Sequence, residues 1–379
     1  MSAADGIPFV DLASQTRALR AEIEAAWAGC LDRCDFILGA ETERFEAEFA
    51  EWLGARHVVG VGSGGEALVL ALDALGVGPG DCCVVPANTF IATPLAASRL
   101  GARVAWCDVD PLTRVMSAST LERALAALPA AVRPAAVLPV HLCGRAVPTE
   151  VFELCALRGI PVVEDAAQSH GARFADGTAT GTRGRLGCFS FYPGKNLGAF
   201  GDAGAVCTQD DALAARLRRA RNYGQRVKYQ HVELGTNSRL DTLQAAVLRV
   251  KLRRLPEWNR AREAAAARYE PLLAEAVPEA GRPAPAPPGQ HVWHLYRIEC
   301  RDPEHRARIA AALRERGIET GVHYPTPCHL QPCYAGSTRD LPDLSVSEAE
   351  ARRTLSLPLF PEITPEQQQR VAEALRAVW

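Results

Sequence analysis

The sequence predicts an α/β fold with two domains, and this prediction depends on the chain length and on two patterns along the chain. The chain has 379 residues, more than one domain of ordinary size, and 48% of them are hydrophobic. From residue 57 to about 208, short apolar runs alternate with helical patterns. The runs at 135–140 and 160–163 are apolar on both faces, as expected for strands of a mostly parallel sheet that is covered by helices on both sides.

The expected elements of the larger domain follow one another in a regular order. The predicted strands are HVVGV (57–61), CCVVP (82–86), RVAWCDVD (103–110), AAVLPVHL (135–142), IPVVED (160–165), CFSFYP (188–193) and AGAVCT (203–208). A helix from about Gly65 to Leu75 and another after Thr89 lie between the first strands. Two further helices are expected over 211–222 and 240–255, and the arginines 249, 253 and 254 are expected to face solvent.

A Pro-rich stretch, GRPAPAPPG (281–289), separates these elements from a smaller unit at the carboxyl end. This unit contains HLYRIEC (294–300), a helix from about Pro303 to Arg316, TGVHYP (320–325) and a last helix over 365–378. The pattern predicts a small α+β domain. We place the boundary so that residues 1–255 form the large domain and residues 256–379 form the small one.

Charge and cysteine content exclude several classes of protein. The 42 basic residues nearly balance 44 acidic ones, which disfavours binding to nucleic acid. No stretch approaches the ~18 to 20 apolar residues of a membrane span, so we expect a cytoplasmic protein with no membrane partner. The twelve cysteines lack paired CxxC spacing, and we expect reduced, mostly buried thiols and no metal site.

Two charged residues stand where chemistry is expected. Asp165 ends an apolar strand, at the edge of the sheet where ligands bind in open α/β folds. Lys195 lies in a Gly-rich turn just after another strand. Enzymes that use pyridoxal phosphate (PLP) need a lysine for the Schiff base and an aspartate to keep the pyridine nitrogen protonated. Together, the two residues indicate a PLP site.

Two further features fit the same cofactor. The segment VGVGSGGEALVLAL (59–72) is a strand that enters a helix through Gly64 and Gly65. Free N–H groups at such a helix start can bind a phosphate, although this signal alone is weak. Phe90 follows the next strand and offers a flat face to an aromatic ring.

Over nearly its whole length the sequence resembles the DegT/DnrJ/StrS family of sugar-nucleotide aminotransferases, which are PLP enzymes of fold type I (aspartate aminotransferase-like). The segments that carry the resemblance are FILGAETERFEAEFA (36–50), GDCCVVPANTFIAT (80–93), LPVHLCGR (138–145), VVEDAAQSHGA (162–172), FSFYPGKNLGAFGDAGAV (189–206), NYGQRVKYQ (222–230), GTNSRLDTLQAAVLRVKL (235–252) and VHYPTPCHLQPCY (322–334).

The resemblance implies a role for each matching cofactor residue. Lys195 is expected to bind PLP covalently and to move the proton during catalysis, and Asp165 to pair with the pyridine nitrogen. The other implied cofactor residues are Gln168 beside the phenolic oxygen, Phe90 against the ring, and Ser190, Gly64 and Gly65 at the phosphate. Asn237 is expected to reach the phosphate from the other subunit of a homodimer. The family commonly has threonine where Gly65 stands, so one phosphate-binding hydroxyl is missing here.

The resemblance also implies the substrates. The amino donor is expected to be L-glutamate, and the acceptor a dTDP-linked 3-keto-6-deoxyhexose that becomes a 3-amino sugar nucleotide. Tyr192, Lys228, His323 and Tyr324 match positions that contact the hexose or its diphosphate. A lysine near a diphosphate is physically sensible as a mobile positive charge.

Other functions remain open on the sequence alone. The ketone could belong to a 4-keto sugar or to a cyclitol, and a catalytically idle regulatory protein is a less favoured alternative. Dehydratases of the family replace the Schiff-base lysine by histidine, whereas Lys195 is present here.

Overall fold

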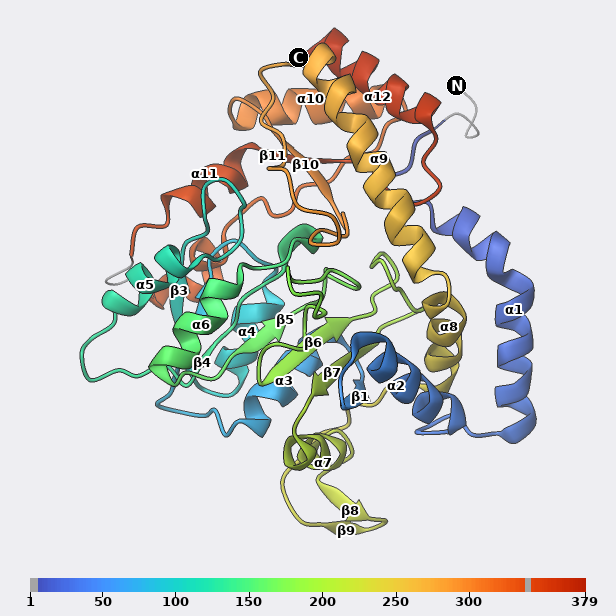
Figure 1. Cartoon of the computed structure of the whole chain (residues 1–379), viewed down its shortest axis with the longest axis vertical. Coiled ribbons are helices and arrows are strands. Elements are labelled where there is room, and N and C mark those ends of the chain that lie inside the picture. The colour runs from blue at the N-terminus through green and yellow to red at the C-terminus, as the bar shows by residue number, and fades with distance from the viewer. Residues whose placement is uncertain (1–5, 338–341) are drawn as a thin grey trace.

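The structure, a computed structural model, describes residues 6–337 and 342–379. A mixed sheet occupies the lower part of the molecule in Figure 1. Its strands are β1 (His57–Val61), β2 (Cys82–Pro86), β3 (Arg103–Cys107), β4 (Ala136–Val137), β5 (Val163–Asp165), β6 (Leu186–Ser190) and β7 (Gly204–Thr208).

The strands form two ladders, β1-β7-β6-β5 and β3-β2-β4, which single bridges join into one sheet. Val137 pairs with Val162 and Val140 pairs with Asp165, both in parallel. β7 runs antiparallel to both of its neighbours, β1 and β6, and the other ladders between described strands of this sheet are parallel. The sheet is therefore mostly parallel and mixed, as the sequence predicted.

Helices cover both faces of this sheet, because its strands carry apolar side chains on both sides. Val58 of β1 packs with α2 and α8, whereas the next residue, Val59, packs with α3 and α7 on the opposite face. The helices of this part are α1 (Leu12–Arg33), α2 (Ala40–Leu53), α3 (Gly64–Ala74), α4 (Ala92–Arg99), α5 (Ala118–Ala126), α6 (Thr149–Arg158), α7 (Asp211–Ala220) and α8 (Thr242–Leu252). A hairpin, β8 (Gln225–Val227) and β9 (Gln230–His231), projects at the bottom of Figure 1.

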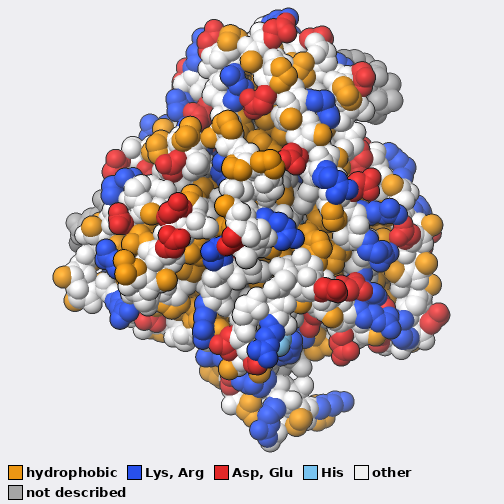
Figure 2. All heavy atoms as spheres, in the orientation of Figure 1, with side chains coloured by type: hydrophobic (Ala, Val, Ile, Leu, Met, Phe, Trp, Pro, Cys, Tyr) orange, Lys and Arg blue, Asp and Glu red, His pale blue; other side chains and the backbone are white. Residues whose placement is uncertain are grey.

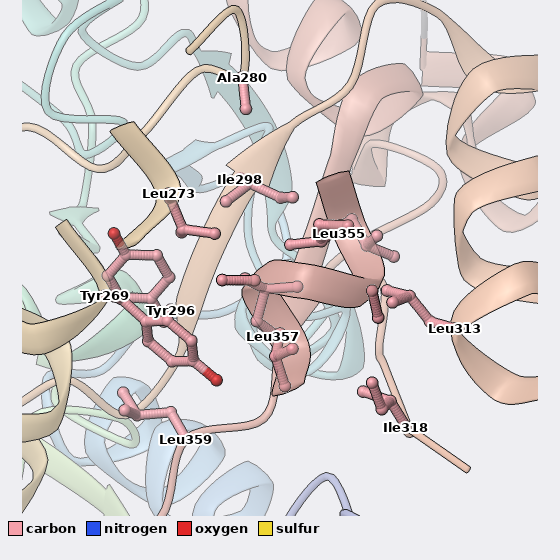
Figure 3. Packing of buried hydrophobic residues seen from close by; sticks show 14 of the residues in the cluster. Tyr269, Leu273, Ala280, Tyr296, Ile298, Leu313, Ile318, Leu355, Leu357 and Leu359 are labelled. Atoms are coloured by element: carbon pink, nitrogen blue, oxygen red, sulfur yellow. The ribbon is translucent and has the colours of Figure 1, made fainter. Parts of the chain in front are cut away.

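The part of the molecule at the top of Figure 1 has its own hydrophobic core, which is shown in Figure 3. It is built from α9 (Leu255–Ala276), β10 (Tyr296–Glu299), α10 (Pro303–Glu315), β11 (Thr354–Leu357) and α12 (Pro365–Val378), with α11 (Ser345–Arg353) leading into β11. The ring centroids of Tyr269 and Tyr296 lie 5.0 Å apart within this core. Ile7 from the other end of the chain also packs here. The domain boundary at residues 255 and 256 stays a prediction.

One expectation about surface charge is wrong. Arg249 does not simply face solvent, because α2 packs on α8 and places Glu41 and Glu48 against its guanidinium. Arg253 and Arg254 lie nearer the surface, and both contact Glu22.

The cysteines are free thiols, and all but Cys34 and Cys333 are buried. No group of three or more His, Cys, Asp or Glu side chains is arranged to hold a metal within residues 6–337 and 342–379. In the same part of the chain, no helix combines the length and the apolar character needed to cross a membrane.

Candidate active site

A cavity of about 750 Å³ opens at the carboxyl ends of the central strands, where the two parts of the molecule meet. Figure 2 shows hydrophobic side chains gathered in this region, below the upper part of the molecule. The structure brings ten of the predicted site residues together around the cavity: Gly64, Gly65, Phe90, Asp165, Gln168, Ser190, Tyr192, Lys195, His323 and Tyr324.

Asp165 ends β5 and turns its carboxylate toward the cavity. Oδ2 accepts a hydrogen bond from the Thr93 hydroxyl at 2.7 Å, and Oδ1 accepts one from the Ala167 N–H at 3.1 Å. Burial raises the pKa of Asp165, and the bond from Thr93 opposes this shift. Both donors are uncharged, so the carboxylate is well placed to receive a cationic N–H from a ligand.

Lys195 lies in a tight turn after β6. The backbone N–H of Lys195 donates a hydrogen bond to the Tyr192 carbonyl at 2.8 Å. The side-chain amine of the buried Lys251 donates one to the Gly198 carbonyl at 2.8 Å. A Cβ at residue 198 would lie 2.2 Å from the Pro193 carbonyl oxygen, so only glycine closes this turn. Burial lowers the pKa of Lys195 to about 8, while the charge of Asp165 opposes the shift. The amine is therefore partly neutral near physiological pH.

Gln168 joins the sheet side of the cavity to the opposite wall. Its Oε1 accepts a hydrogen bond from the Cys143 N–H at 2.6 Å, and its Nε2 donates to the Tyr324 hydroxyl at 3.1 Å. The Tyr324 ring in turn lies 5.5 Å from the ring of Phe90. Three of the predicted residues thus form one connected wall.

The start of α3 approaches the end of β6 closely. A Cβ on Gly64 would lie 2.5 Å from the Ser190 Cβ, so the backbone can approach Ser190 only because residue 64 is glycine. At Gly65 the nearest atoms to such a Cβ lie 3.8 and 3.9 Å away, so this position has room for a side chain. The free N–H groups of the helix start and the Ser190 side chain form a concave, polar cradle suited to an anion.

His323 lies on the side of the cavity that the C-terminal part of the chain forms. Its ring stacks on Phe9 with centroids 5.5 Å apart, and Nδ1 lies 2.8 Å from the Ser356 hydroxyl oxygen. Burial lowers the pKa of His323 to about 4, so the ring is neutral at physiological pH.

Two predicted residues lie away from the cavity of their own chain. Lys228 is exposed in the hairpin, with its amine 5.2 Å from the centre of the Tyr229 ring. Asn237 is also exposed and pairs with Asn222 through the backbone.

Two polar residues stand out among those of this site that the sequence did not predict. Thr93 holds the Asp165 carboxylate, and His294 lines the cavity with Nδ1 3.1 Å from Asn196 Oδ1. The repeat of Thr89 and Thr93 four residues apart was the available signal, since it places both hydroxyls on one side of a helical turn.

Two other polar residues near the strand ends have structural roles. Glu164 points away from Asp165, and its carboxylate accepts hydrogen bonds from the backbone N–H groups of Gly181, Arg183 and Gly184. His141 lies against the same carboxylate at 2.9 Å.

Comparison with known proteins shows the family of the chain. The family model of the DegT/DnrJ/EryC1/StrS aminotransferases matches residues 17–376. The chain belongs to this aminotransferase family. Its similarity to a curated transaminase of Streptomyces venezuelae, named dTDP-3-amino-3,4,6-trideoxy-alpha-D-glucose transaminase, amounts to 46% identity over 98% of this chain and 95% of that relative.

Two solved structures extend the comparison. The crystal structure of DesV from S. venezuelae, in complex with a ketimine intermediate, superposes with a TM-score of 0.90 at 46% identity and covers 98% of both chains. NtdA from Bacillus subtilis, with bound cofactor PMP, has a TM-score of 0.89 at 32% identity and covers 99% of this chain and 85% of its own. These matches confirm the predicted fold class, fold type I, and the prediction of an aminotransferase.

Proposed function

We propose that this aminotransferase uses PLP to transfer the amino group of L-glutamate to C3 of a dTDP-linked 3-keto-6-deoxyhexose. The observation that carries the proposal is the meeting of Lys195 and Asp165 in one desolvated cavity. The names of the dTDP-sugar relative and of the PMP-bound neighbour support the sugar and the cofactor respectively.

The residues of the cavity fit PLP group by group. Asp165 would pair with the protonated pyridine nitrogen, since its buried carboxylate accepts only from uncharged donors in the protein. Gly64, Gly65 and Ser190 would hold the phosphate, and Phe90 and Gln168 would contact the ring and its phenolic oxygen. When bound, PLP supplies an electron sink and carries the amino group between the two substrates.

Lys195 is the proposed catalytic base. Its neutral amine would take the proton from the α-carbon of glutamate. In the second half-reaction its protonated form would give a proton to C3 of the sugar. A pKa of about 8 makes this amine available without strongly basic conditions. The tight turn around it fixes the backbone from which the side chain enters the cavity, which favours proton transfer over a short distance.

The sugar would lie against the C-terminal side of the cavity. His323, neutral at physiological pH, and Tyr324 would contact the hexose, and Tyr192 lies at the mouth beside Lys195. Lys228 would bind the diphosphate as a positive charge.

The exposed positions of Lys228 and Asn237 support a homodimer with shared active sites. Exposed hydrophobic side chains occur in two segments: Leu31, Phe36 and Ile37 in the first, and Tyr223, Val227, Tyr229, Val232 and Leu234 in the segment that carries Lys228. The first segment lies beside the chain that follows Asn237, because Ile37 pairs with Asp241. Leu234 is 97% exposed. Exposed hydrophobic side chains that are grouped in this way mark an interaction surface. A second copy would cover these side chains and bring Asn237 to the phosphate of the partner.

The test is incubation with glutamate and each candidate ketone, with the product identified by NMR. We expect amination of dTDP-3-keto-6-deoxyglucose to be faster than that of dTDP-4-keto-6-deoxyglucose or of a keto-cyclitol. Faster amination of the 4-keto sugar would overturn the C3 assignment and leave the aminotransferase assignment intact. A protein that turns over none of these ketones would point to the regulatory alternative.

A further inference from the structure

Helix α11 connects the sheet-bearing part of the molecule to the C-terminal core. Its first turn is fixed by Asp108, which accepts hydrogen bonds from the N–H groups of Val346 and Ser347 and from the Ser347 hydroxyl. Its last residue, Arg353, leads directly into β11, which pairs with β10 in the other part. Figure 1 shows α11 on the left, between α5 and these two strands.

Glu350 of α11 is a buried carboxylate with a partner on each side. Oε2 accepts a hydrogen bond from the Asn88 side chain at 2.7 Å, and Oε1 pairs with Arg297 Nη1 of β10 at 2.6 Å. Glu350 is 2% exposed and Asn88 is 5% exposed, so water does not screen either contact.

Each partner of Glu350 lies next to a wall of the active-site cavity. Asn88 directly precedes Thr89 and Phe90, which line the cavity on the sheet side. Arg297 also donates to the His323 carbonyl at 3.2 Å, and His323 and Tyr324 line the opposite side. One carboxylate thereby links the two walls without reaching the cavity itself.

We propose that Glu350 is a positioning residue that fixes the His323–Tyr324 segment relative to the Thr89–Phe90 wall. The inference rests on the proposed function, in which the first segment contacts the hexose and the second contacts the cofactor. Glu350 sets the separation of these groups, and hence where the ketone of the sugar lies relative to the amino group that it receives. Glutamate needs no contact with His323 in this scheme, so its half-reaction should depend less on Glu350 than the half-reaction of the sugar does.

The test compares Glu350→Gln with Glu299→Gln in the holoenzyme. Glu299, which lies in β10, is the matched control because it is also a carboxylate paired with arginines. It accepts hydrogen bonds from Arg114 and Arg353. We expect Glu350→Gln to raise the KM for dTDP-3-keto-6-deoxyglucose about tenfold and to lower kcat, because it weakens a charged hydrogen bond that sets geometry. The single-turnover rate with glutamate alone should stay within about twofold of the wild-type rate.

Asn88→Ala tests the same link from its other end and serves if Glu350→Gln does not fold. It should also raise the KM for the sugar nucleotide and should slow the glutamate half-reaction less, although Phe90 contacts the cofactor in both half-reactions. The double variant should be no worse than the poorer single variant, because both substitutions break one link.

Equal losses in the two half-reactions, or a Glu299→Gln variant with the same KM effect, would overturn the assignment to Glu350. An unchanged KM in both Glu350→Gln and Asn88→Ala would do the same. A wild-type enzyme that aminates none of the keto sugars would instead overturn the proposed function, and the role of Glu350 with it.

Discussion

At the scale of single residues, burial moves the pKa values of the two central groups toward each other. It raises the pKa of Asp165 and lowers that of Lys195 to about 8. Each shift favours the uncharged form, and the charge of each residue opposes the shift of the other. The site therefore contains an amine that can lose its proton near neutral pH and a carboxylate whose ionisation depends on its hydrogen bonds.

The pH dependence of PLP binding by the apoenzyme tests the lowered pKa of Lys195. Lys195 reacts only as the free amine, and the fraction of free amine rises as the pH passes through about 8. The rate of covalent attachment, followed by borohydride trapping of the cofactor on the protein, should rise with a midpoint near that pH. Lys195→Ala should retain no cofactor on denaturation after borohydride treatment at any pH, and should give no transamination. A midpoint above about 10, the value of an ordinary lysine, would contradict the desolvated setting.

The Thr93→Val substitution tests the ionisation of the Asp165 carboxyl. The substitution removes the hydroxyl that donates to Asp165 Oδ2, so the pKa of the carboxyl should rise further above its ordinary value. Because Asp165 must be ionised, activity should be lost first on the acid side, and kcat/KM near pH 6 should fall about tenfold. The effect should be smaller at pH 8.

Thr89→Val is the matched control for this variant. Thr89 contacts the Thr93 hydroxyl at 2.9 Å but leaves the bond from Thr93 to Asp165 in place. The acid limb of the pH profile of kcat/KM for Thr89→Val should stay near that of the wild-type enzyme. An acid limb that moves equally in both variants would argue against a specific role of Thr93.

The sequence predicted the residues of the site that stand at strand ends and in turns, because such positions have local patterns. Asp165 ends an apolar run and Lys195 lies among glycines. His294 has no such pattern, and the spacing of Thr93 from Thr89 does not show that Thr93 meets Asp165, since both places depend on how α4 and the segment before β10 pack against the sheet. Sequence spacing does not encode that packing.

At the scale of elements, the strands were more predictable in position than in length. The run AAVLPVHL predicts a long strand, whereas β4 contains only Ala136–Val137. Pro139 has no N–H to donate to a ladder, so the pairing continues beyond it only as the single bridge between Val140 and Asp165. The helix expected over 240–255 ends at Leu252, and α9 begins at Leu255, a break that the apolar pattern did not reveal.

The start of α3 gives a prediction at this scale. Gly65→Thr places a hydroxyl where the surroundings leave room, so it should supply the phosphate contact that the family commonly has. We expect the dissociation constant of PLP, measured by equilibrium dialysis, to fall about threefold to tenfold. Gly64→Ala is the opposite case, since its Cβ would meet Ser190 at 2.5 Å, and it should weaken binding. Weaker binding in Gly65→Thr would contradict the phosphate cradle proposed here.

At the scale of the whole molecule, one chain accounts for only part of the proposed site. Ten predicted residues surround the cavity, while Lys228 and Asn237 lie in exposed segments. The hairpin that carries Lys228 projects from the molecule, and Figure 2 shows Lys and Arg side chains on it. The sequence alone could indicate these residues only through a resemblance, because an arrangement between two chains leaves no periodic pattern within one.

Complementation between two inactive variants tests this arrangement. We expect Lys195→Ala to be inactive, and Asn237→Asp to be strongly impaired because it brings a negative charge to the partner's phosphate. In a mixed dimer one site then carries both substitutions, whereas the other combines the intact Lys195 of one chain with the intact Asn237 of the other. After exchange of equal amounts, half of the dimers are mixed, so activity should return at about a quarter of all sites. Lack of recovery, once subunit exchange has been verified by mass spectrometry, would mean that Asn237 serves its own chain, and a fully active monomer would exclude shared sites altogether.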